Sequence, residues 1–178
     1  MPDRQKHAPS VALLEPDIEQ PAARGSAPGD DPARRVEIVS VSAADEDHDA
    51  LERCLDRAWT LQRAYRLEDG LGLLCNRSNT TPAVICDQDL QPDAWKVLLR
   101  GMAWLSNPPL LIISSGRPDA QLWAEAVNLG AYDVLAKPFD ESEVRRTVLS
   151  ACARWKDRSA YRNPAAIRPG SGVADSAA

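Results

Sequence analysis

Short apolar segments alternate along the middle of the chain with segments whose apolar residues recur at helical spacing. The apolar segments are rich in β-branched residues, as strands are, and lie at residues 36–41, 60–65, 82–86, 110–113 and 132–136. Between and after them, apolar residues three or four positions apart predict helices at residues 45–59, 68–76, 95–105, 122–130 and 140–155. This alternation predicts an α/β domain with a parallel sheet covered on both faces.

Right-handed crossovers leave few topologies for such a chain. For a domain of this size we expect a doubly wound, five-stranded parallel sheet in the flavodoxin-like order 2-1-3-4-5, with helices on both faces. Ligands of such sheets bind beyond the carboxyl ends of the strands. The residues that follow each strand are therefore the first candidates for a functional site.

The composition changes at both ends of this alternating region. Residues 1–35 hold six of the fourteen prolines, and residues 157–178 are rich in Ser, Ala, Gly and Pro. Segments of this kind bury too little apolar surface to offset their ordering entropy. We therefore predict a folded domain at 36–156 between two disordered tails, with too few residues after it for an output domain. Within the first tail, the apolar run Val11–Leu14 is either a docking motif or an inert patch.

Charge and composition exclude several classes of protein. The net charge of −5 argues against general nucleic-acid binding. No apolar run is long enough for a signal peptide or a membrane span, so we expect a soluble, cytoplasmic protein. The cysteines have no metal-binding spacing and lie in apolar runs, which predicts reduced core thiols; they are Cys54, Cys75, Cys86 and Cys152.

Three kinds of polar side chain follow three of the predicted strands. Asp87 comes directly after the third strand, Ser114 and Ser115 follow the fourth, and Lys137 follows the fifth. These side chains should converge on one edge of the sheet. A carboxylate, a hydroxyl and an ammonium suit a phosphoryl group, because the carboxylate accepts it and the other two bind its oxygens.

The same residues carry a resemblance to a known family. The segment Val84–Asp87, the hydroxyl after the next strand and the segment Gly130–Phe139 together resemble a response-regulator receiver domain, over roughly residues 36–155. The Gly-Ala…Lys-Pro-Phe part is the most specific. The resemblance implies that the domain is no enzyme and that a histidine kinase or phosphotransfer protein donates to it. It also implies that the face of the fourth helix, fifth strand and fifth helix binds a downstream protein.

The resemblance also assigns roles to single residues. It implies that Asp87 is the phosphoacceptor, that Ser114 is the switch hydroxyl, with Ser115 beside it, and that Lys137 pairs with the phosphoryl group. The peptide bond before Pro138 is cis in the family, a state that sequence alone would not indicate. Val134 occupies the position at which the family usually has an aromatic ring that reports the switch, and valine cannot report by that motion.

A second departure concerns the metal. Receivers usually carry two acidic residues after the first strand, which hold Mg²⁺, whereas Ser42 and Ala43 stand there. Mg²⁺ is therefore doubtful. The acidic run Asp45–Asp47 is expected to cap the first helix and face solvent, although a shifted register would bring Asp45 towards the site. Asp89 would add a ligand by its carbonyl or its side chain.

Each of these residues also has a purely structural interpretation. Asp87 would cap the loop before the third helix, the two serines would satisfy backbone groups, and Lys137 would be an ordinary exposed lysine. His48 is expected on the exposed face of the first helix and is not proposed as a phosphodonor. The tryptophans at 95, 104, 123 and 155 are expected in the core or half-buried, and those at 123 and 155 are alternatively interface residues.

Two other functions remain open at this point. The first is a pseudo-receiver, a protein-binding module of the same fold that works without phosphorylation; Ser42, Ala43 and Val134 favour it. The second is a haloacid-dehalogenase-like phosphatase, because Asp87 and Asp89 also resemble that family's D-x-D motif. Such an enzyme needs further acidic residues after the lysine, and Asp140, Glu141 and Glu143 look instead like the first turn of a helix.

Overall fold

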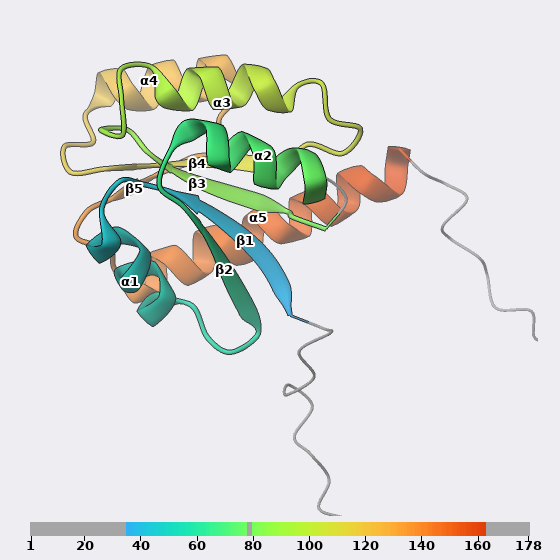
Figure 1. The fold of residues 1–178 in the computed structure, drawn as a ribbon, viewed down its shortest axis with the longest axis horizontal. Coiled ribbons are helices and arrows are strands. Elements are labelled where there is room, and N and C mark those ends of the chain that lie inside the picture. The colour runs from blue at the N-terminus through green and yellow to red at the C-terminus, as the bar shows by residue number, and fades with distance from the viewer. Residues whose placement is uncertain (1–34, 78–79, 163–178) are drawn as a thin grey trace, which may run out of the picture.

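The computed structural model describes residues 35–77 and 80–162 as an alternating α/β domain (Figure 1). The predicted tails, apart from residues at their inner ends, lie outside the described residues. Strands and helices follow one another in strict alternation along the chain, in the order β1 Val36–Val41, α1 Asp45–Cys54, β2 Trp59–Ala64, α2 Leu67–Arg77, β3 Ala83–Asp87, α3 Ala94–Met102, β4 Leu110–Ser115, α4 Ala120–Leu129, β5 Asp133–Ala136 and α5 Glu141–Arg162.

The five strands form one parallel sheet in the order β2-β1-β3-β4-β5, which confirms the predicted fold class. The chain starts in the middle of the sheet, winds to one edge and then crosses back to the other. As a result, β1 and β3 are neighbours while their connections leave in opposite directions. This reversal of winding is the switch point at which sheets of this type bind ligands.

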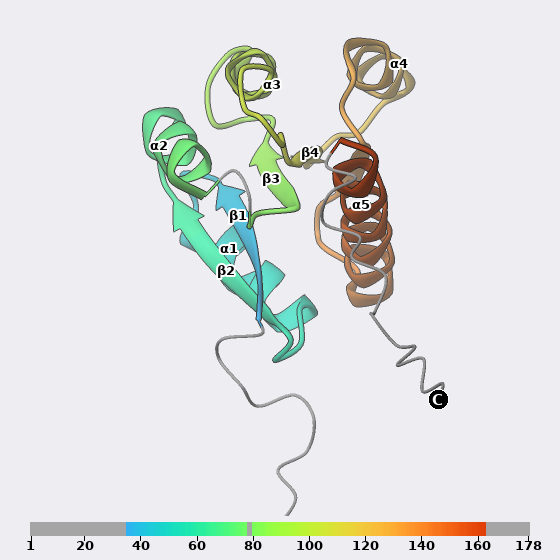
Figure 2. The same ribbon diagram turned by 90° about the vertical axis from the view of Figure 1, so that its right-hand side faces the viewer.

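The sheet separates two hydrophobic cores. Alternate residues of the strands pack on one face against α2, α3 and α4, and the remaining ones pack on the other face against α1 and α5. Figure 2 shows α2, α3 and α4 along one side of the strands, away from α1 and α5. Strands β3 and β4 are buried along their whole length, as their almost continuous apolar sequences predict. On β3, Ile85 belongs to the α1–α5 face, and Asp87, two residues later, therefore starts from the same face.

Several helix ends follow their predicted signals. Gly130 ends α4 in the left-handed conformation, with φ of 100°, and its N–H bonds back to the last turn. The Asp140 side chain accepts a hydrogen bond from the N–H of Glu143 at 2.9 Å, which makes it the N-cap of α5. The acidic residues 140, 141 and 143 are therefore at the start of this helix. The close packing of α2 on the sheet needs Gly70, because a Cβ there would lie 2.8 Å from a methyl group of Val41.

Other expectations were wrong in detail. Helix α1 ends at Cys54, before the last apolar residues that had been assigned to it, and Trp59 begins β2. Helix α5 runs on to Arg162, beyond residue 155 where its predicted range ended, and in its last turns Ser159 donates a hydrogen bond to Asn107, in the loop before β4, at 3.0 Å. Cys75 is exposed rather than in the core. Across the described ranges, no helix combines the length and the apolar character that crossing a membrane requires.

Candidate functional site

Asp87 is the last residue of β3 and lies at the carboxyl edge of the sheet. Asp87 is only 7% exposed, and its register partner on β4 is Ser114. Neighbouring residues in register on parallel strands start from the same face of the sheet. The structure therefore brings this carboxylate and this hydroxyl to the same edge and face.

Lys137 follows β5 and reaches back to Asp87. Its Nζ donates a hydrogen bond to Asp87 Oδ1 at 2.8 Å. Its backbone N–H donates to the carbonyl of Ser115 at 2.8 Å, which fixes the start of the loop against β4. The next peptide bond, Lys137–Pro138, is cis as the resemblance implied.

Asp47 is the residue that the sequence analysis missed. Its Oδ2 accepts hydrogen bonds from Lys137 Nζ at 2.5 Å and from the Ser42 hydroxyl at 2.6 Å. Its side chain is 15% exposed, so the expectation that it faces solvent was wrong. Asp47 stands four residues before Leu51 and seven before Cys54, which puts it on the inward stripe of α1. That spacing was the signal that would have found it.

The two positions proposed for extra metal ligands lie elsewhere. Asp45 accepts a hydrogen bond from the Tyr65 hydroxyl at 2.7 Å, and its side chain is 71% exposed, so the idea that it turns towards the site was wrong. The Asp89 side chain is exposed in the loop after β3. Ser42, in place of a carboxylate, holds Asp47 and also accepts a hydrogen bond from the N–H of Ala44 at 3.2 Å.

The two serines after β4 differ in their surroundings. The Ser115 hydroxyl accepts a hydrogen bond from the N–H of Arg117 at 3.1 Å and so stabilises the turn. The Ser114 hydroxyl is in a residue only 2% exposed and forms no hydrogen bond within residues 35–77 and 80–162.

The charges of the site depend on one another. Burial lowers the pKa of Lys137, but the hydrogen bonds that its ammonium donates to Asp47 and Asp87 outweigh burial and raise the pKa above its ordinary value. The ammonium is therefore charged at neutral pH, between two carboxylates. Burial, together with the charge of Asp87, raises the pKa of the neighbouring Cys86 thiol to about 12. That thiol stays protonated and does not compete with the carboxylate as a nucleophile.

His48 is buried beside the site, not on the exposed face that the sequence analysis assigned to it. Its Nε2 lies 3.1 Å from the carbonyl of Ser42, and its Nδ1 lies 3.0 Å from the hydroxyl of Ser40. A carbonyl only accepts, so Nε2 carries the proton and Nδ1 accepts from Ser40. The neutral ring thereby fixes the backbone of Ser42, whose side chain holds Asp47.

This buried ring makes the domain sensitive to acid. Burial lowers the pKa of His48 below its ordinary value, which outweighs the opposing effects of the Ser42 carbonyl and of Asp47 and Asp45. Below about pH 6.5 the unfolded chain takes up a proton that the folded domain resists, so stability falls by up to about 1.4 kcal/mol per pH unit. We expect urea unfolding, followed by Trp fluorescence between pH 5 and 8, to show this slope, and His48→Gln to flatten it. Equal slopes for the two proteins would contradict the assignment.

The carboxylates of Asp47 and Asp87 also fit a divalent cation. Each shares one oxygen with Lys137 and has a second oxygen that forms no hydrogen bond in the described part of the chain. Mg²⁺ is commonly held by one or two carboxylates, with water and phosphate oxygens completing the shell. Two carboxylates and one ammonium leave a net negative charge here, which favours a cation. The two carboxylates therefore fit Mg²⁺, although Asp47 is at neither of the positions after the first strand where the family usually carries acidic residues.

Comparisons with known proteins support the resemblance. No protein-family model matches the chain. Its fold superposes with a TM-score of 0.61 on the signal receiver domain of an HD domain-containing protein from Pseudomonas fluorescens Pf-5, with 28% identity over 71% of this chain and 93% of that one. A response regulator receiver domain protein from Clostridium thermocellum gives a TM-score of 0.60 at 20% identity, over 69% of this chain and 98% of that one. The chain thus has the fold of response-regulator receiver domains and resembles them in sequence.

A curated relative agrees with this assignment. The regulatory protein VirG of Agrobacterium fabrum is 34% identical over 95 residues, which are 50% of this chain and 37% of VirG. The chain thus matches well under half of that protein. Receiver domains are signalling modules of two-component systems and generally bind Mg²⁺ at the phosphorylation site. Val134, to which the resemblance assigns the position of the switch aromatic, is 3% exposed and packs in the core with α2, α3 and α4.

Proposed function

We propose that this receiver accepts a phosphoryl group on Asp87 within a two-component phosphorelay. The observation that carries the proposal is the contact of Asp87 Oδ1 with Lys137 Nζ at 2.8 Å, at the carboxyl edge of the sheet and beside the Ser114 hydroxyl. A structural cap would not need a half-buried ammonium opposite it. Phosphoryl transfer, by contrast, depends mainly on positioning and on charge stabilisation, which these groups supply.

The chemistry assigns one role to each group. A carboxylate oxygen of Asp87 attacks the phosphorus of a donor phosphohistidine. A P–O bond forms, the P–N bond breaks, and the departing imidazole nitrogen keeps the electron pair and takes a proton from solvent. Lys137 binds a phosphoryl oxygen and offsets its charge, and the Ser114 hydroxyl donates to another oxygen. The product is an acyl phosphate on Asp87.

The site needs more positive charge than Lys137 provides. Asp47 and Asp87 already surround the ammonium, and a phosphoryl group adds about two negative charges. In this proposal Asp47 and Asp87, with the carbonyl of Asp89, would hold Mg²⁺, and the bound cation would supply charge neutralisation. Asp47 would thereby supply the carboxylate ligand that Ser42 and Ala43 cannot provide.

The donor in this proposal is a histidine kinase or a phosphotransfer protein. The downstream partner would bind the face formed by α4, β5 and α5. On α4, Trp123 and Val127 are 43% and 53% exposed, and on α5 Leu149 is 57% exposed. Exposed apolar residues on adjacent elements favour a protein partner over free solvent.

Incubation with phosphoramidate and Mg²⁺ tests the function directly. We expect intact-mass spectrometry to show the addition of a single phosphoryl group, and hydroxylamine to remove it, because acyl phosphates react with this nucleophile. The gain should depend on Mg²⁺. A protein that gains no mass at millimolar Mg²⁺, while its amide spectrum shows the folded domain, would contradict the proposal.

The variant Asp47→Asn tests the metal ligands without using phosphorylation. Asparagine keeps the shape but removes one charge near the cation, which should weaken Mg²⁺ binding by about tenfold or more. We expect Mg²⁺ titration followed by the amide signals of Asp87, Gln88 and Ser114 to show this loss. Asp45→Asn is the matched control on the same helix turn and should bind as the unmodified protein does. Equal weakening by both variants would indicate a general effect of charge instead of a ligand.

A further inference from the structure

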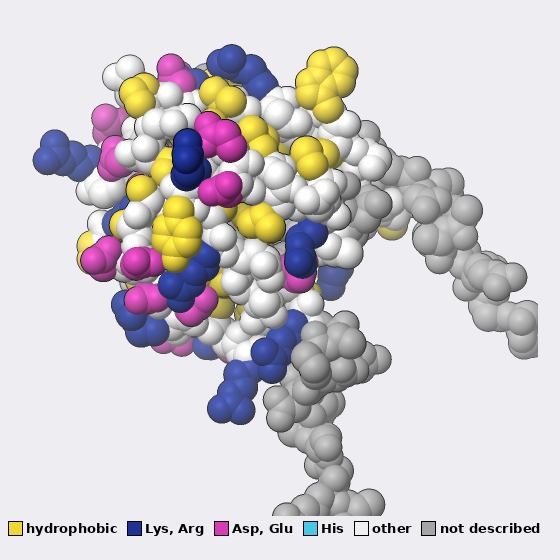
Figure 3. All heavy atoms as spheres, in the orientation of Figure 1, with side chains coloured by type: hydrophobic (Ala, Val, Ile, Leu, Met, Phe, Trp, Pro, Cys, Tyr) yellow, Lys and Arg dark blue, Asp and Glu magenta, His cyan; other side chains and the backbone are white. Residues whose placement is uncertain are grey.

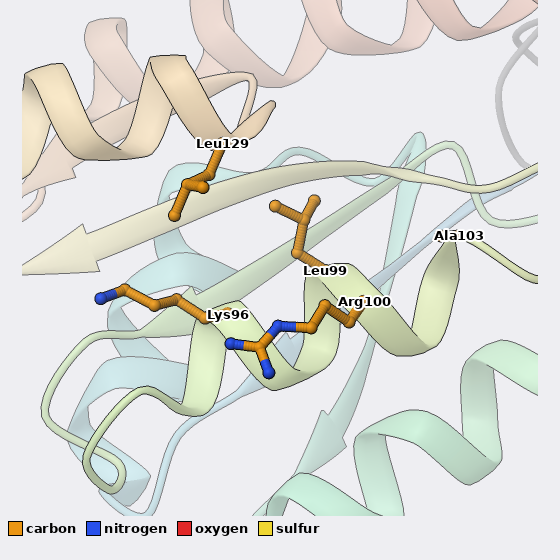
Figure 4. A pocket seen from close by; sticks show the side chains of 5 residues that line it. All are labelled: Lys96, Leu99, Arg100, Ala103 and Leu129. Carbon is orange, nitrogen blue, oxygen red and sulfur yellow. The ribbon is translucent and has the colours of Figure 1, made fainter.

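An apolar groove lies between α3 and α4, on the opposite side of these helices from the α4–β5–α5 face. Figure 4 shows Leu99 of α3 and Leu129 of α4 pointing towards each other across it. Two adjoining hollows of about 240 and 230 Å³ share Leu99, Ala103 and Leu129 in their walls. The second hollow continues past Pro108 and Pro109 to the start of β4. The groove therefore opens at the amino-terminal edge of the sheet, away from Asp87.

Packing explains why the groove stays open. Helices α3 and α4 make almost no direct contact, since each packs on the sheet and α3 also packs against α2. An ion pair between Lys96 and Glu125 joins the two helices at one end of the groove. Figure 3, which views one face, shows hydrophobic side chains scattered over the region of α2 and α3 among charged ones.

Basic residues line the groove, and an exposed aromatic follows one of its lining residues in the sequence. Arg100 lines the first hollow and forms no hydrogen bond or ion pair with other described residues. Arg158 lines the second hollow. Trp104 follows Ala103 directly and is 92% exposed, contrary to the expectation that it is in the core or half-buried. A ligand of this groove should thus combine apolar side chains with negative charge.

We propose that the groove binds the chain's own N-terminal segment, residues 11–19. This segment reads Val-Ala-Leu-Leu-Glu-Pro-Asp-Ile-Glu. Its apolar residues match the leucine-lined walls, and its acidic residues match the arginines that line the groove. Of the two interpretations of Val11–Leu14, a docking motif and an inert patch, the groove supports the first.

The reach of the chain allows this contact. Arg35 precedes β1, and the amino-terminal ends of parallel strands share one edge of the sheet. The start of β4 is two strand spacings, about 10 Å, away from β1. The link from residue 19 to residue 35 spans up to about 50 Å when extended, so it covers this distance easily. Tethering keeps the segment at an effective concentration on the order of millimolar, which allows even a weak contact to be populated.

A spin label on the segment tests the contact in the full-length chain. Cys75 is exposed and is replaced by serine, while the thiols of Cys54, Cys86 and Cys152 are buried and do not react. A label attached through Ala12→Cys should then broaden the amide signals of Leu99, Ala103 and Gly130. The variant Leu13→Asp should abolish this loss of signal.

A pair of matched variants tests the groove side. Leu129 and Leu149 are both exposed leucines, at 51% and 57%, and only Leu129 lines the groove. We expect Leu129→Asp to abolish the broadening and Leu149→Asp to leave it unchanged. The amide spectrum of each variant reports in the same experiment that the domain is folded.

Three outcomes would overturn the proposal. Absence of broadening would mean that the groove is empty or binds a separate partner. Broadening that survives Leu129→Asp would place the segment elsewhere. Broadening of an isotope-labelled chain by a spin label carried on a second, unlabelled chain would assign the groove to another copy. The proposal does not depend on phosphorylation of Asp87 and is tested without it.

Discussion

Asp87→Asn will abolish phosphorylation by phosphoramidate while leaving the domain folded. Asparagine keeps the size of the side chain and can accept the hydrogen bond from Lys137, but its amide does not attack phosphorus to form an acyl phosphate. Lys137 also keeps its contact with Asp47. We therefore expect the free energy of unfolding to stay within about 1 kcal/mol of that of the unmodified protein, and intact mass to show no gain.

The matched control is Asp89→Asn, two residues later in the same loop. The Asp89 side chain is exposed, and only its backbone carbonyl has a role in the proposed site. This variant should gain the phosphoryl group as the unmodified protein does. A mass gain that survives in Asp87→Asn would place the phosphoryl group on another residue. Signalling that survives in Asp87→Asn would instead indicate a phosphorylation-independent binding module.

Lys137→Met will destabilise the domain and slow phosphorylation together. Methionine keeps much of the apolar stem but leaves the two carboxylates of Asp47 and Asp87 facing each other, 15% and 9% exposed, without their shared cation. Removing one partner of a buried ion pair costs about 3 to 5 kcal/mol, and the partial exposure here reduces this to about 2 kcal/mol. The loss of charge stabilisation should slow phosphoryl transfer about 100-fold.

Lys96→Met provides a matched comparison. The Lys96 side chain is 21% exposed, against 19% for Lys137, and it also pairs with two carboxylates, Asp93 and Glu125. Those carboxylates are 63% and 43% exposed, so solvent screens them and the loss should be much smaller than at Lys137. Urea unfolding measures both variants. Equal losses would mean that burial of the partner carboxylates does not decide the stability of the site.

The effect at Lys137 should persist through neutral pH. The folded-state pKa of this lysine is raised, so its contribution to stability is fully present below the ordinary lysine pKa and is lost only as the pH rises through the folded-state value. Between pH 6 and 9 we therefore expect the difference between Lys137→Met and the unmodified protein to be constant. The change of the free energy of unfolding with pH in weak acid is assigned instead to His48.

The strand-end part of the site was predicted from the sequence, whereas the helical part was missed. Asp87, Ser114 and Lys137 each follow an apolar strand, and a parallel sheet brings such positions to one edge whatever the details of packing. Asp47 lies on a helix whose rotation about its axis decides whether the side chain points inward. Three consecutive acidic residues at the start of that helix favour a solvent-facing interpretation.

His48 was misplaced for a related reason. A histidine among charged residues has the sequence context of an exposed position. Its burial depends on two hydrogen-bond partners from β1 and from the residue after it, Ser40 and Ser42, which become neighbours only when α1 packs on the sheet. The spacing of three residues between His48 and Leu51 was a local sign of this burial. The outermost turns of α5 escaped prediction because their contacts are with the loop before β4.

Asp47 lies on α1 and not at the end of a strand, so the distance between its carboxylate and Lys137 depends on how α1 packs on the sheet. A strand end is held in register by its neighbours, whereas a helix resting on a sheet can slide or tilt as a unit. A protein that binds α1 and shifts it would move the Asp47 carboxylate towards Lys137 or away from it. Docking of a donor on that helix would then alter the reactivity of Asp87 before the phosphoryl group arrives.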